Sequence, residues 1–362
     1  MSLQPLDPLI LALRQPAAVS MFGLPAWETL IRDARRSNLL ARVALDVEAL
    51  GLHQRVPEAP RAHLDAARNL AQAQAAAVRR EVAFVDRALA AAGVPIVLLK
   101  GAAYLIAGAQ ASRGRLFSDV DILVPRAAIV DVESMLMRQG WAAIKTSAYD
   151  QRYYRRWMHE LPPLRHHTRQ TVLDVHHAIL PTTARLKPDS AKLLAASLSL
   201  PGEPRLRVLA PIDMVLHSAT HLFCNEDVGN SLRDLVDLDG LLREFATNEG
   251  LWAQLTARAQ ELDLTRPLYY ALRYAVRILA TPVPAAVLRA AKRAGPPAWL
   301  RGVMDALFLH TLDPAREREN QRLATLARGS LYVRAHWLRM PPLLLIRHLT
   351  TKALRREQAT VP

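Results

Sequence analysis

The feature that most constrains the fold of this chain is a pair of acids at the start of an apolar run, "SDVDILVP" at residues 118–125. Successive side chains of a β-strand point to opposite faces, so Asp119 and Asp121 face the same way and bring two like charges close together. That arrangement costs stability unless a cation lies between the carboxylates. Because carboxylate oxygens are the natural ligands of Mg²⁺, the pair predicts a divalent-cation site on a buried strand.

A third carboxylate is available in "TVLDVHH" at 171–177, where Asp174 lies among apolar residues of another predicted strand. Two magnesium ions held by such acids can activate an attacking oxygen and stabilise a leaving pyrophosphate. Upstream, the predicted strand "IVLLK" is followed by Gly101 at the start of a predicted helix, where free backbone N–H groups can hold phosphate. The cations near this turn in the sequence are Lys100, Arg113 and Arg115.

The periodicity of apolar residues divides the chain into three regions. Up to residue 92, alanines and apolar residues at three- and four-residue spacing predict helices. Gly93 and Pro95 then end this pattern, and a mixture of strands and helices follows. The strands are expected at "PIVLL", at "DVDILV" and roughly at 141–147, 162–168 and 171–177. We therefore predict an α+β fold with an N-terminal helical region (1–92), a core (93–185) and a C-terminal helical region (186–362).

The segments "VLLKGAAY…SRGRLFSDVDILVP…GW…LDVHH" resemble the uncharacterised nucleotidyltransferase family of the DNA polymerase β-type superfamily. The likeness covers roughly residues 60–245, including "HSATHLF" and "LRDLVDLDGLL". It implies a polymerase β-like core, which is a small mixed sheet with helices. The resemblance also implies roles for individual residues: Asp119, Asp121 and Asp174 as catalytic metal ligands, and Lys100, Gly101 and Arg115 at the nucleotide. More familiar members of the superfamily have Gly-Ser or Gly-Gly where this chain has Gly101-Ala102, which removes one expected phosphate contact.

The resemblance implies transfer of a nucleoside monophosphate from a nucleoside triphosphate such as ATP, with two Mg²⁺ ions, to an unidentified acceptor. That acceptor can be a small molecule, a protein or RNA. One alternative is a toxin-like transferase that adds nucleotides to tRNA. Another is a catalytically silent nucleotide-binding scaffold.

Several residues allow a second interpretation. Arg115 can pair with an Asp to hold its loop instead of contacting nucleotide, and His176 can orient a carboxylate, touch substrate or pack in the core. His217 and His221 have the i, i+4 spacing of two zinc ligands, with Asp234 or Asp237 as candidate third ligands. The Glu of a metalloprotease motif is absent after His217, so helix packing or substrate contact is favoured over zinc.

The charge and cysteine content bear on partners and location. The chain has 47 Lys and Arg against 33 Asp and Glu, a net charge of +14, which favours polyanionic partners. A basic tail at 332–356 predicts contact with RNA or with an anionic membrane. The single cysteine, Cys224, fits a reducing compartment. We find no signal peptide and no apolar run near the roughly 20 residues of a membrane span. We therefore expect a cytoplasmic protein, with peripheral binding to the inner face of the membrane as the alternative.

Overall fold

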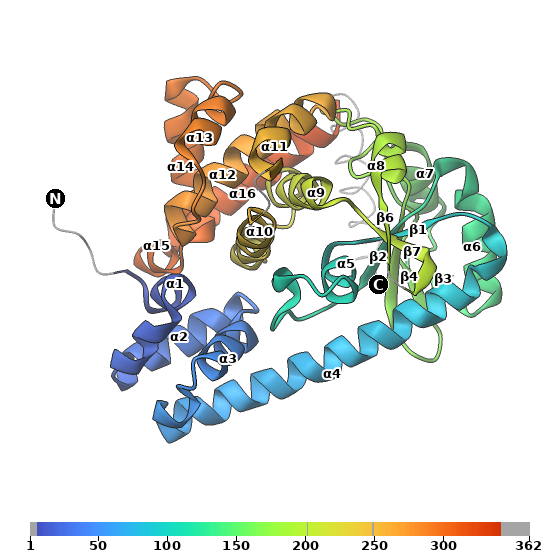
Figure 1. Cartoon of the computed structure of the whole chain (residues 1–362). Coiled ribbons are helices and arrows are strands. Elements are labelled where there is room, and N and C mark those ends of the chain that lie inside the picture. The colour runs from blue at the N-terminus through green and yellow to red at the C-terminus, as the bar shows by residue number, and fades with distance from the viewer. Residues whose placement is uncertain (1–5, 201, 248–249, 342–362) are drawn as a thin grey trace, which may run out of the picture.

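The computed structural model describes residues 6–341 except 201, 248 and 249. The fold is of the α+β class, as predicted, with one mixed sheet beside a larger set of helices (Figure 1). Among the described residues, no helix is long and apolar enough to cross a membrane.

The sheet has seven strands in the order β3-β4-β5-β2-β1-β7-β6. They are β1 (Ile96–Leu99), β2 (Val120–Leu123), β3 (Trp141–Ala143), β4 (Leu164–His166), β5 (Val172–His176), β6 (Leu198–Leu200) and β7 (Glu203–Val208). The central strand β2 pairs antiparallel with β1 and parallel with β5. Every residue of β1 and β2 is buried. The continuous apolar sequence of β1, and of β2 apart from Asp121, is the pattern expected of strands covered on both faces.

The N-terminal region is helical, as its periodicity predicts. It contains α1 (Pro8–Arg14), α2 (Leu24–Arg36), α3 (Leu40–Ala49) and α4 (Glu58–Ala88), with short 3-10 helices at Pro16–Met21, His53–Arg55 and Ala90–Ala92. Figure 1 shows α4 as one long helix that leads from α2 and α3 to the sheet. The chain then turns at Gly93, whose φ of 65° lies in the left-handed region that glycine adopts without strain.

Three helices connect the first strands. They are α5 (Lys100–Ile106), α6 (Ile129–Arg138) and α7 (Ala148–Trp157), with 3-10 helices at Gln110–Ser112 and Arg126–Ala128. The strands expected near 141–147, 162–168 and 171–177 are present as β3, β4 and β5. Each is shorter than predicted, because turns occupy the ends of the three segments.

The C-terminal part differs from the prediction in one respect. Its helices are α8 (Ser190–Ala196), α9 (Pro211–Cys224), α10 (Ser231–Phe245), α11 (Gly250–Glu261), α12 (Thr265–Leu279), α13 (Ala285–Lys292), α14 (Ala298–Leu312), α15 (Pro314–Glu319) and α16 (Gln321–Arg339). However, residues 198–200 and 203–208 form β6 and β7, so the expectation of helices throughout this part is wrong there. The reason is that β1 offers a free edge, and β7 pairs with it in parallel, placing Leu206 and Val208 beside Ile96 and Leu98. The division into three domains stays a prediction.

The helices from the two ends of the chain pack against each other. Arg318 of α15 forms ion pairs with Asp7, at the start of α1, and with Asp33 of α2. The Arg14 guanidinium donates to the carbonyl of Ile278 at 2.6 Å. One hydrophobic cluster runs through the terminal helices, α9, α10 and the sheet. This packing fixes α9 and α10 beside the strands that carry the acids.

Candidate active site

A cleft of about 260 Å³ lies between the central strands and the helices α9 and α10. The sheet side supplies acids, of which Asp119 and Asp174 line the cleft. Asp121 lies deeper, with 2 % of its surface exposed. The helical side adds basic and polar groups, and the cleft residues from α9, α10 and α16 include His217, Ser218, His221, Arg233 and Arg339.

Strand register brings the three predicted acids together. Asp121 of β2 and Asp174 of β5 are direct neighbours across the parallel pair, and Asp119 precedes Asp121 by two residues. Burial, followed by the charges of Asp121 and Glu160, raises the pKa of Asp174 to about 7. Burial and the charge of Asp121 also raise the pKa of Asp119. One carboxylate oxygen of Asp174, Oδ1, is buried with no hydrogen-bond partner. The acids therefore repel one another around a position that a cation would stabilise.

Lys100 and His176 both donate hydrogen bonds to the Asp121 carboxylate. Lys100 Nζ donates to Asp121 Oδ1 at 2.7 Å, and His176 Nε2 lies 2.9 Å from the same oxygen. Burial by itself would raise the pKa of Asp121, but the Lys100 ammonium and the His176 imidazole together hold it well below its usual value. Lys100 begins α5 with a φ of 47°. A non-glycine residue in this region is strained, and such strain is most common at functional sites. His176 thus orients a carboxylate, which is one of the roles considered for it.

Arg115 lines the same cleft, but its ion pair is with Asp237 and not with one of the three acids. Its Nε donates to Asp237 Oδ2 of α10 at 2.8 Å, and its guanidinium lies 5.5 Å from the centre of the Phe117 ring. The same guanidinium crosses Gly101 so closely that a Cβ at this position would collide with it. This close approach explains a glycine at residue 101 without any phosphate, and the phosphate-holding roles of Gly101 and Arg115 stay predictions. Arg113 donates to the carbonyl of Leu45 at 2.7 Å and is not among the residues that line the cleft.

The Arg115→Met variant is expected to unfold with a free energy about 3 kcal/mol lower than that of the wild type. The reason is that Arg115 and Asp237 have side chains only 9 % and 8 % exposed, so the variant leaves a buried carboxylate without its partner. Urea denaturation measures this difference. Arg113→Met is the matched control, because Arg113 is 36 % exposed and should cost much less. Equal losses in the two variants would contradict a structural role for the Arg115–Asp237 pair.

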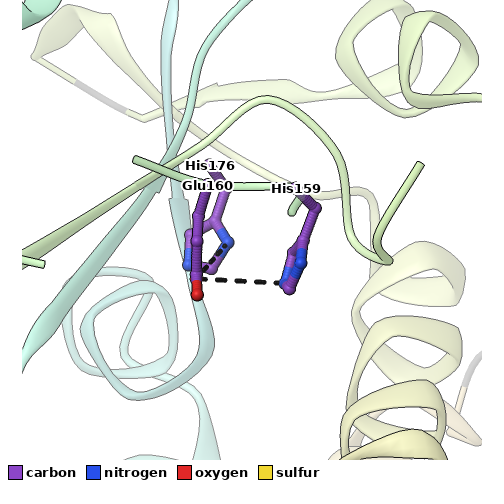
Figure 2. Close-up of side chains that lie close together, drawn as sticks. All are labelled: His159, Glu160 and His176. Carbon is purple, nitrogen blue, oxygen red and sulfur yellow. Dashed lines mark ion pairs between the residues drawn. The ribbon is translucent and has the colours of Figure 1, made fainter. Parts of the chain in front are cut away.

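Sequence reasoning missed two residues of the cleft, His159 and Glu160. They lie in a loop that pairs with β5 through a single backbone bridge between Glu160 and His176. Glu160 Oε2 is 3.2 Å from His176 Nδ1 and 3.9 Å from His159 Nε2 (Figure 2). The segment "HELPP" has no strand periodicity, so no pattern places it beside Asp174. The one signal in the sequence is that His and Glu are both residue types that bind metal ions.

Of the residues considered for zinc on α9 and α10, Asp234 lies beside one histidine, with its Oδ2 3.5 Å from His221 Nδ1. His217 and His221 both line the cleft, but Asp234 pairs with Arg233 and Asp237 pairs with Arg115. Among the residues that the structure describes, the group with three close metal-ligand atoms is His159, Glu160 and His176 instead.

Comparison with models of known families places most of the chain in one family. The model of the family described as uncharacterised nucleotidyltransferase matches residues 25–280, which is more than half of the chain. The protein belongs to this family, and general nucleotidyl transfer is the class of reaction that the family supports. The matched segment contains the sheet, α9, α10 and the acids of the cleft. Neither the curated proteins nor the solved structures contain a match to the chain.

Proposed function

We propose that this protein transfers a nucleoside monophosphate from a nucleoside triphosphate to an acceptor, using Asp119, Asp121 and Asp174 as the ligands of two Mg²⁺ ions. The observation that carries the proposal is the placement of Asp174 beside Asp121 on paired strands, at the floor of an open cleft. The mixed sheet around these strands is compatible with a polymerase β-like core. Family membership supports the reaction class.

The donor set fits magnesium. Three carboxylates converge, and burial followed by the charge of Asp121 raises the pKa values of Asp119 and Asp174. The buried Oδ1 of Asp174 has no hydrogen-bond partner among the described residues. When bound there, Mg²⁺ would activate the attacking oxygen and neutralise charge on the leaving pyrophosphate. Without a metal ion, the Lys100 ammonium balances the charge of Asp121. We propose that Lys100 exchanges this carboxylate for a phosphate oxygen of the triphosphate.

The chain itself supplies the positioning. A triphosphate in the cleft would meet Lys100 on the sheet side and Arg233 on the helical side, and both can neutralise phosphate charge. In-line attack needs no protein nucleophile, because orientation and charge neutralisation supply most of the rate acceleration. The cleft is open to solvent on one side, so an acceptor oxygen can approach the triphosphate. These residues do not define which acceptor is used.

The affinity for Mg²⁺ is expected to rise with pH until about pH 7, by up to about tenfold per pH unit. The reason is that Asp174, with its pKa raised by burial and by Asp121, must lose a proton before it can bind the ion. Between about pH 4 and 7, Asp174 is protonated in the folded protein but ionised in the unfolded chain. Without metal, Asp174 therefore lowers the free energy of unfolding as the pH rises through this range.

Magnesium titrations from about pH 5 to 8 test this dependence against Asp174→Asn, which lacks the titrating group. Burial lowers the pKa of His176, but its bond to Asp121 and the charge of Glu160 raise this pKa above the usual value, and this second titrating group is present in both proteins. The difference between wild type and variant is therefore the quantity to compare. A pH dependence that persists unchanged in Asp174→Asn would contradict the assignment of Asp174.

Parallel labels on the α- and γ-phosphates test the reaction class. Each of the four nucleoside triphosphates is incubated with the purified chain, Mg²⁺ and fractions of total RNA, protein or small metabolites. We expect the α-label to appear in one fraction with release of pyrophosphate, and transfer to tRNA would identify the toxin-like alternative. Transfer of the γ-label, or binding of nucleotide with no transfer to any fraction, would overturn the proposal in favour of a kinase or a silent scaffold.

The location and the membrane or RNA contacts stay predictions. The basic tail at 332–356 lies outside the described residues from 342 onward. Within the described part of this tail, Arg334 donates to the carbonyl of Phe223 at 2.7 Å, and Arg339 pairs with Glu226 at 2.9 Å. These two arginines therefore contribute to packing within the fold.

A further inference from the structure

We infer that His159, Glu160 and His176 form a separate binding site for Zn²⁺ next to the three acids. This site goes beyond the proposed function, and its occupation can be measured without any nucleotide. In Figure 2, dashed lines join the Glu160 carboxylate to the imidazole rings of His176 and His159. All three residues line the cleft.

His176 presents one ring nitrogen to this site. Its Nε2 lies 2.9 Å from Asp121 Oδ1, and because a carboxylate can only accept, the proton of that bond belongs to Nε2. In a neutral ring Nδ1 then carries a lone pair, and this buried atom makes no hydrogen bond although Glu160 Oε2 is 3.2 Å away. Histidine ligands of metals usually donate their other N–H to a carboxylate, which fixes the ring. The contact between His176 and Asp121 has this form.

His159 and Glu160 supply the other two donors. His159 Nε2 is the ring nitrogen 3.9 Å from Glu160 Oε2, and His159 Nδ1 is buried without a hydrogen-bond partner. One ligand atom from each of the three residues falls within 4.8 Å of the others. The separations of Glu160 Oε2 from the two imidazoles are 3.2 and 3.9 Å. Two ligands about 2.1 Å from a tetrahedral ion lie roughly 3.4 Å apart, so small side-chain rotations would close the site.

The backbone holds this cluster in place. The Leu161 N–H donates to the Val175 carbonyl at 2.9 Å, and the His177 N–H donates to the His159 carbonyl at 2.8 Å. The loop of His159 and Glu160 is therefore fastened to β5, which carries His176. Ligands held by regular backbone pairing lose little conformational freedom when an ion binds.

The donor types separate this site from the magnesium site. Two imidazoles and one carboxylate are a ligand set of catalytic zinc centres, and they leave a fourth position for water or a substrate oxygen. Magnesium prefers oxygen ligands alone, as the three aspartates provide. The competing interpretation is a simple ion pair between a protonated His176 and Glu160, in which His159 has no role.

The test uses Zn²⁺ alone on the full chain after removal of metals with a chelator. Isothermal titration is expected to give one zinc ion per chain in the presence of excess Mg²⁺, and Co²⁺ in its place should give the visible absorption of a four-coordinate site. His159→Asn and Glu160→Gln should each weaken zinc binding at least about tenfold. His221→Asn is the matched control, because His221 lines the same cleft on α9, and it should bind zinc as the wild type does.

Three results would overturn the inference. They are the absence of zinc binding by the wild type, unchanged binding in His159→Asn, and loss of binding in His221→Asn alone. Thermal unfolding of each variant without metal shows whether it is folded. If His159→Asn does not fold, His159→Gln takes its place. Asp119→Asn separates the two metal sites, since it should keep zinc and lose magnesium-dependent nucleotide binding. If the proposed function is wrong, the magnesium-dependent nucleotide binding would be missing but zinc binding would remain.

Discussion

The Asp121→Asn variant is expected to transfer nucleotide at least about a hundredfold more slowly than the wild type. Asp121 is the most buried of the three acids, and its oxygen is held by Lys100 and His176. An amide at this position keeps the size of the side chain but removes the charge on which a two-metal site depends. Initial rates of α-label transfer to the accepting fraction measure the loss.

Asp227→Asn is the matched control for this prediction. Asp227 also lines the cleft, but it is exposed and its Oδ1 accepts from the Gly229 N–H at 2.8 Å. An Asn in its place can still accept this hydrogen bond, so transfer should remain near the wild-type rate. Wild-type transfer by Asp121→Asn would contradict the two-metal assignment, provided that the variant unfolds at a similar temperature.

The Lys100→Met variant is expected to lower the free energy of unfolding by about 3 kcal/mol in the absence of metal. The Lys100 side chain is 21 % exposed and that of Asp121 only 3 %, so the change leaves a buried carboxylate with His176 as its remaining partner. Magnesium should then raise the unfolding temperature more in Lys100→Met than in the wild type. The reason is that the ion no longer competes with the ammonium group for Asp121.

Lys192→Met tests whether burial is the cause of this effect. Lys192 forms an ion pair with Glu261 at 3.1 Å, but both side chains are more than 40 % exposed, and water and salt screen such a pair. Its loss should therefore change stability little, with no altered response to magnesium. Two results would contradict competition between Mg²⁺ and the Lys100 ammonium for Asp121. They are an equal loss of stability in the two lysine variants, and a smaller stabilisation of Lys100→Met than of the wild type by magnesium.

The sequence predicts the individual strands of the site better than it predicts which strands lie side by side. Short apolar runs in "DVDILV" and "TVLDVHH" predict two buried strands with acids, because such a run can be recognised in each segment by itself. The placement of Asp174 directly beside Asp121 depends on which strands pair, and that is decided by distant parts of the chain. The same limit hides β7, whose short run becomes a strand only because β1 offers it an edge.

The remaining surprises come from contacts between segments far apart in the sequence. Arg115 finds Asp237 on α10, 122 residues away, and this contact explains why residue 101 is a glycine. Glu160 reaches His176 through one backbone bridge within a loop. Neither contact has a periodic signal, because each arises from side chains that meet only after the helices and the sheet have packed.

Nucleotide binding with and without Mg²⁺ tests the central claim most directly, because it requires no knowledge of the acceptor. Isothermal titration would use nucleoside triphosphate analogues that cannot be cleaved between the α- and β-phosphates. The account predicts binding to the wild type that depends on Mg²⁺ and is lost in Asp119→Asn, Asp121→Asn and Asp174→Asn. Binding of equal strength without Mg²⁺, and in all three variants, would contradict it.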